Sequence, residues 1–165
     1  MMLGMSLSTF TTVHVLISLV GIGSGFAVLL GLFSAKRVNG LTALFLFTTV
    51  LTSVTGFGFP FTHLLPSHKI AIISLLVLAI AILARYSFHM VGQWRWIYVG
   101  TAMIALYLNV FVLVFQSFEK VPALTAMAPT QSEPPFLVAQ LAVMAIFIVL
   151  TIFAVKKFHP DMGRA

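Results

Sequence analysis

Five long apolar segments divide this chain and leave room for little other structure. They cover residues 10–33, 41–60, 69–90, 97–117 and 136–155, and each has about the 20 residues that an α-helix needs to cross a bilayer. Asp, Glu, Lys and Arg make up only 7% of the 165 residues, against about 25% in a typical soluble domain. So few charges cannot cover a water-facing surface. The sequence therefore predicts one all-α domain, an integral membrane bundle of five transmembrane helices.

The basic residues indicate which side of the membrane each connector faces. With the N-terminus outside, the outer side receives only Lys69 and Lys120. The cytoplasmic side receives Lys36, Arg37, Arg85, Arg95, Lys156, Lys157 and Arg164. Because short cytoplasmic loops are rich in Lys and Arg, we expect an outer N-terminus and a cytoplasmic C-terminus. No basic residue precedes the first apolar segment, so we expect that segment to be retained rather than cleaved as a signal peptide.

Three absences narrow the range of functions. The chain has no Cys, which excludes disulfides, thiolate-bound iron–sulfur clusters and thioether-linked haem. Its acids, Glu119, Glu133 and Asp161, lie outside the predicted spans, whereas ion-coupled carriers commonly use carboxylates within the membrane. The net charge of +6 is scattered over the ends of apolar segments, which argues against nucleic-acid binding because no basic face is formed.

Small and hydroxyl-bearing residues follow one face of each of the first two spans. These faces consist of His14, Ser18, Gly21 and Gly25 in the first span and of Thr48, Thr52 and Thr55 in the second. Gly21 and Gly25 form a small-xxx-small step, which lets two helices approach closely. Threonine hydroxyls bond to carbonyls of the preceding turn, so such a stripe is usually internal. We therefore expect helix packing along both faces, with a polar path as the alternative.

Histidines near the predicted outer face are the candidates for a cofactor site. His14 lies in the first span, and His63 and His68 lie in or beside the second connector. Ionisable groups within a membrane are often functional, so these imidazoles are candidates to ligate the iron of haem b, bind a metal ion or hold a quinone. Their spacing matches no fixed metal-binding motif, and ordinary solvated histidines are the competing interpretation.

Four amide side chains suggest a polar pocket that opens outward, beside His14. They are Asn109, Gln116, Gln131 and Gln140. An amide in a span must find hydrogen-bond partners, so we expect Asn109 to face the bundle interior. A structural hydrogen bond between helices is the competing interpretation.

Arg85 lies about one turn inside the predicted inner interface. A long basic side chain at this depth usually extends along the helix to the membrane surface. The sequence therefore predicts contact between Arg85 and an anionic lipid headgroup.

Four stretches carry a resemblance to a known family. They are TTVLTSVTGF at 48–57, WRWIY at 94–98, YLN at 107–109 and TQSEPPF at 130–136. Through them, nearly the whole chain resembles an uncharacterised family of small, polytopic inner-membrane proteins of proteobacteria. The resemblance implies a bacterial inner membrane, and it carries no activity and no functional residue.

Two classes of function remain open from the sequence. The first is a non-enzymatic bundle, either an accessory subunit within a homo-oligomer or beside a partner membrane subunit, or a unit that binds or passes a small solute. The second is a redox protein that holds haem b or a quinone with the outer histidines, and a metal site without redox chemistry would use the same residues. Because no catalytic constellation is recognisable, we favour the first.

Overall fold

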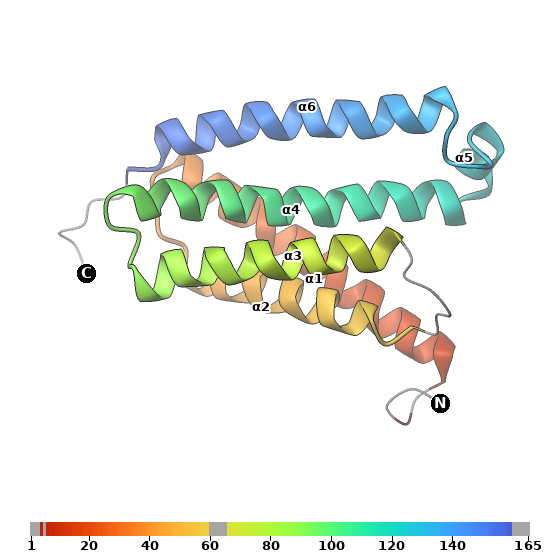
Figure 1. The fold of residues 1–165 in the computed structure, drawn as a ribbon, viewed down its shortest axis with the longest axis horizontal. Helices are drawn as coiled ribbons and strands as arrows, with labels where there is room; N and C mark the ends of the chain where they lie inside the picture. Colours follow the sequence, from red (N-terminus) through yellow and green to blue (C-terminus); the bar gives the residue numbers. More distant parts are fainter. Residues whose placement is uncertain (1–3, 5, 60–65, 160–165) are drawn as a thin grey trace.

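The computed structural model describes residues 4, 6–59 and 66–159, and these are mostly helical. The long helices are α1 (Leu7–Phe33), α2 (Asn39–Gly56), α3 (Pro66–Ile82), α4 (Gln93–Lys120) and α6 (Pro134–Lys157). A π-helical turn, η1 (Leu83–Ser87), continues α3, and a short helix, α5 (Pro122–Met127), precedes α6 (Figure 1). No strand occurs within the described ranges. Five helices, with α3 and η1 taken together, are long and apolar enough to span a membrane. The predicted all-helical fold with five helices of membrane-spanning length is therefore confirmed for the described residues.

The helix ends lie within about four residues of the ends of the predicted spans. The sequence did not indicate α5, which lies in the connector after α4. Pro122 occupies its first turn, where the missing N–H costs nothing. The hydroxyl of Thr125 donates to the carbonyl of Phe118 at 2.8 Å. This bond folds α5 back onto the end of α4.

The central helix of the bundle is α4, which contacts α1, α3 and α6, while α2 packs against α1 and α3. Figure 1 shows α3, α4 and α6 running nearly side by side, with α1 and α2 inclined to them. The described chain begins at one end of the bundle and finishes at the other (Figure 1). This arrangement follows from the odd number of long helices.

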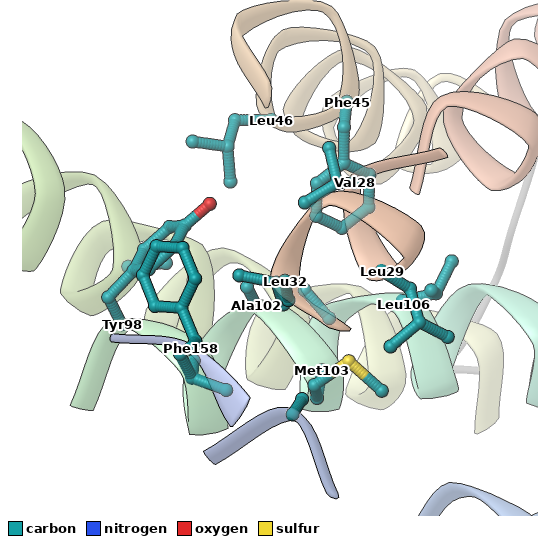
Figure 2. Close-up of a cluster of buried hydrophobic side chains, with 14 of the residues drawn as sticks. Val28, Leu29, Leu32, Phe45, Leu46, Tyr98, Ala102, Met103, Leu106 and Phe158 are labelled. Carbon is teal, nitrogen blue, oxygen red and sulfur yellow. The ribbon is translucent and has the colours of Figure 1, made fainter. Parts of the chain in front are cut away.

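The core forms where α1, α2 and α4 meet. Figure 2 shows Val28 and Leu32 of α1 among side chains of α2 and α4, with Phe158 against Tyr98. A Cβ at Gly25 would lie 2.5 Å from Cδ1 of Leu106 and 2.9 Å from Cε2 of Phe45. Only a residue without a side chain fits at this contact.

The helix least covered by the rest of the protein is α6. Only 17% of its most apolar 18-residue window is buried. Its exposed side chains are large and apolar, including Leu141, Ile148 and Phe153. In a membrane protein, such a surface faces lipid or a partner helix.

Candidate functional site

A line of polar side chains runs between α1 and α2, and His14 lies at its end. Nδ1 of His14 lies 2.8 Å from Oγ1 of Thr55, and the imidazole meets the Phe59 ring edge to face at 5.1 Å. One turn along α1, the Ser18 hydroxyl donates to the His14 carbonyl at 2.8 Å and contacts Oγ1 of Thr52 at 3.4 Å. The two predicted stripes therefore face each other, and Nδ1 of His14 forms its hydrogen bond with a residue of α2.

The line of polar side chains extends to α4 at Gly21, where α1 lies close to residues of both α2 and α4. A Cβ there would lie 3.2 Å from Oγ1 of Thr48 and 3.6 Å from Nδ2 of Asn109. Asn109 donates from Nδ2 to Oγ1 of Thr49 at 3.1 Å. Gly21 therefore leaves space for a hydrogen bond that joins α4 to α2. Asn109 faces the interior of the bundle.

The second described histidine of the outer group, His68, reaches α2 from α3. It is buried, with 2% of its surface exposed, and its ring stacks on Phe57 at 5.4 Å. Both His14 and His68 thus pack around the C-terminal end of α2, one from each neighbouring helix. His63 lies outside the described residues. Within the described ranges, no group of three or more His, Cys, Asp or Glu side chains is placed to hold a metal ion.

Three of the four predicted pocket amides form hydrogen bonds, and their partners lie on two different helices. Asn109 points to α2, whereas Gln140 donates from Nε2 to the carbonyl of Phe111 at 3.1 Å and so joins α6 to α4. Gln131 donates to the carbonyl of Phe115 at 3.4 Å from the connector. Gln116 is half-buried on α4. Oε1 of Gln140 is buried without a hydrogen bond to any described residue.

The polar stretch beside Gln131 folds the connector between α5 and α6. The Glu133 carboxylate accepts from the Thr130 N–H at 3.1 Å, the Thr130 hydroxyl at 2.9 Å and the Ser132 N–H at 3.1 Å. Desolvation tends to raise the pKa of Glu133, but these hydrogen bonds outweigh it and lower the pKa below its usual value. Thr130 and Ser132 are thus explained by the local fold.

At the opposite end of the bundle, Arg85 lies inside the protein. Its exposed fraction is 7%. Nη2 donates to Oδ1 of Asn39 at 2.7 Å, and Nη1 lies 3.7 Å from the sulfur of Met90. The guanidinium lies 5.0 Å from the centre of the Tyr98 ring and 5.8 Å from that of Tyr86. No carboxylate of the described residues forms an ion pair with it.

This geometry differs from the expected extension of Arg85 to the membrane surface. Arg85 shares the buried face of α3 and η1 with Leu78 and Ala81, so its side chain points among the helices. Burying an unpaired cation costs several kcal/mol. A charge-assisted hydrogen bond returns about 1.5–3 kcal/mol, and cation–π contacts return about 0.5–2 kcal/mol. The contacts of Arg85 therefore return an amount comparable to this cost, and its headgroup contact stays a prediction.

Two further features surround Arg85. The hydroxyl of Tyr98 is fully buried, and neither Thr42 nor Arg85 beside it meets hydrogen-bond geometry. Beyond Met90, a hollow of about 810 Å³ opens at the turn between η1 and α4. The hollow is lined by Met90, Val91, Gly92, Gln93, Arg95, Trp96 and Ile97. Asn39, Thr42 and Tyr98 were not predicted to lie beside Arg85. The signal in the sequence for an inward-facing Arg85 is its helical spacing from the apolar residues Leu78 and Ala81.

Comparison with protein-family models, with curated proteins and with solved structures gives no match. The site therefore has to be interpreted from its own chemistry.

Proposed function

We propose that this chain is a multi-pass protein of a bacterial inner membrane that acts as a non-enzymatic subunit. Its five apolar helices and its low charge support the membrane assignment. The resemblance to small proteobacterial membrane proteins and the bias of Lys and Arg support an outer N-terminus and a cytoplasmic C-terminus. In this proposal the bundle binds its neighbour within the bilayer and carries out no chemistry of its own.

The observation that carries this proposal is the use of the polar side chains between α1, α2 and α4. His14, Ser18 and Asn109 all contact hydroxyls of α2. Further along α1, Gly25 brings the helix against Phe45 and Leu106. A route for a polar solute would need open space along this interface, whereas here the polar groups bond to one another. This favours a packed subunit over a permeation unit.

The surface offered to a neighbour is the outward face of α6. It carries Leu137, Leu141, Ile148, Ile152 and Phe153, all largely exposed. A second copy of the chain and a different membrane subunit both fit this apolar face, since interfaces in a membrane rest on close packing.

The test is purification in mild detergent, followed by native mass spectrometry and by cross-linking in membranes. Because the chain has no Cys, Ile148→Cys on α6 gives a single cross-linking site, and Leu76→Cys on α3 is a matched exposed control. We expect a defined complex and a cross-link from Ile148→Cys that Leu76→Cys does not give. A strictly monomeric protein with no co-purifying membrane protein would contradict the proposal.

The second candidate function is a membrane redox protein with haem b, a quinone or a metal ion. The specific observation is that His14 and His68 both pack against aromatic rings at the end of α2. The test is a visible spectrum of the protein from haem-replete cells, air-oxidised and then reduced, with elemental analysis. A Soret band that shifts on reduction and is lost in His14→Ala supports haem. A colourless, metal-free preparation rejects the haem and metal forms.

A further inference from the structure

We infer that the end of the bundle formed by η1 and the start of α2 holds a buried binding site for an anionic group of the phosphate class, centred on Arg85. The inference goes beyond the proposed function, and it does not depend on which subunit the bundle contacts.

The first argument is the balance of charge. Arg85 is nine-tenths buried, and no described carboxylate pairs with it. Its hydrogen-bond partner, Asn39, is the first residue of α2, and that helix has neither a side-chain cap nor an acid in its first turn. The N-terminus of a helix carries partial positive charge. A buried cation and a helix N-terminus therefore share one place, and an anion would stabilise both.

The second argument is independent of charge. Tyr98 is fully buried, and its hydroxyl has no partner among the described residues. Figure 2 shows this hydroxyl directed away from Phe158 and toward α2. Thr42 and Arg85 lie beside it without meeting hydrogen-bond geometry, and buried hydroxyls are nearly always hydrogen-bonded, so a well-placed additional acceptor would stabilise this one. An oxygen of a phosphate group accepts from both the Tyr98 O–H and the Arg85 guanidinium.

A ligand would approach Arg85 beside one of two contacts of its guanidinium. Nη2 donates to Asn39, which is an exposed residue. Nη1 lies 3.7 Å from the sulfur of Met90, and Met90 also lines the hollow between η1 and α4. Thioether sulfur is a weak acceptor, and methionine changes conformation easily. A phosphate oxygen would therefore replace Met90 at Nη1.

An anion of this class comes from one of two sources, the headgroup of an anionic lipid or free inorganic phosphate. The test measures the thermal unfolding midpoint of the full chain in detergent with three additives: phosphatidylglycerol, phosphatidylcholine, and sodium phosphate at matched ionic strength. We expect phosphatidylglycerol or phosphate to raise the midpoint by at least about 3 °C. A response to phosphatidylglycerol alone identifies a lipid, and a response to phosphate identifies the free anion. No response to either overturns the inference.

The matched variants are Arg85→Gln and Lys156→Gln, which remove the same charge from the same end of the bundle. We expect Arg85→Gln to abolish the shift and Lys156→Gln to keep it. An equal response from both variants would mean a general effect of charge and would overturn the site.

Tyr98→Phe keeps the test decisive if Arg85→Gln does not fold. It removes an unpartnered hydroxyl, so the midpoint without additive should stay the same or rise. The affinity for the anionic probe should fall about threefold to tenfold. Unchanged affinity would show that the Tyr98 hydroxyl does not bond to the anion, and this would contradict the inference.

Asp161, which lies outside the described residues, is the remaining acid of the chain that could itself pair with Arg85. In our inference, Asp161→Asn leaves the response to the anionic probe unchanged. If Asp161→Asn instead lowers the midpoint of the wild-type protein but not that of Arg85→Gln, the two residues form an ion pair. That result would identify the Asp161 carboxylate, rather than an external anion, as the partner of Arg85.

Discussion

Gly25 is the residue at which α1 meets both α2 and α4. Leu106 and Phe45, the neighbours that a Cβ would strike, are each 1% exposed and held by the surrounding core. Gly23, two residues earlier, faces outward and has nothing within 4 Å of its Cβ position. The two glycines thus lie on one helix in opposite environments.

We predict that Gly25→Ala destabilises the protein by about 1–3 kcal/mol, because the added methyl overpacks a closed interface. Gly23→Ala should leave stability unchanged or raise it by up to about 1 kcal/mol, because alanine favours the helix. The free energy of unfolding, measured by SDS titration in mixed micelles, compares the two directly. Equal effects of both substitutions would show that α1 does not pack through Gly25.

At the scale of helices, α4 is joined to α2 by the bond from Asn109 to Thr49. Bonds between helices in membranes contribute about 0.6 kcal/mol on average and at most about 1.7 kcal/mol. We predict a coupling of about 0.5–1.5 kcal/mol between Asn109→Ala and Thr49→Val in a double-mutant cycle. The control pairs Asn109→Ala with Thr101→Val, because the Thr101 hydroxyl bonds to its own helix at Ile97. Coupling as large in the control as in the main cycle would rule out the direct bond.

The long helices could be predicted because length and apolar composition suffice to define a span. The orientation of α6 about its axis could not, because apolar residues surround this helix on all sides. The packed faces of α1 and α2 could be predicted from their small and hydroxyl-bearing residues, and that of α4 from Asn109, since an amide in lipid has to point inward. The direction of the Arg85 side chain could not be predicted either. A basic residue near the end of a span can extend to the membrane surface or pack among the helices, and which of the two occurs depends on the side chains around it. The short α5 escaped prediction because six residues show no periodicity.

At the scale of the whole molecule, the basic side chains lie unequally at the two ends of the bundle. One end carries the connector with Lys36 and Arg37, the start of α4 with Arg95, and the end of α6 with Lys156 and Lys157; the other carries Lys69 and Lys120. From this asymmetry, the positive-inside rule predicts that the more basic end faces the cytoplasm. It also sets which leaflet supplies any lipid that reaches Arg85.

The chain contains no Cys, so single cysteines can report the orientation without background. Ser34→Cys and Gln93→Cys mark the end that holds Arg85, and Ser8→Cys and Ala126→Cys mark the other; all four positions are exposed. In intact spheroplasts, we predict that an impermeant maleimide labels Ser8→Cys and Ala126→Cys at once. It should label the other pair only after lysis. Gly23→Cys, which faces outward from the middle of α1, should stay unlabelled in both states because thiols in lipid remain protonated.

The opposite labelling pattern would place the basic end outside and contradict the orientation, while leaving the packing around Arg85 unchanged. Labelling of both ends in intact cells would mean that the chain inserts in two orientations. A bias of the size seen in this sequence normally selects one orientation. In the predicted orientation, the start of α2 and the buried Arg85 face the cytoplasmic leaflet, where anionic headgroups and cellular phosphate are both within reach.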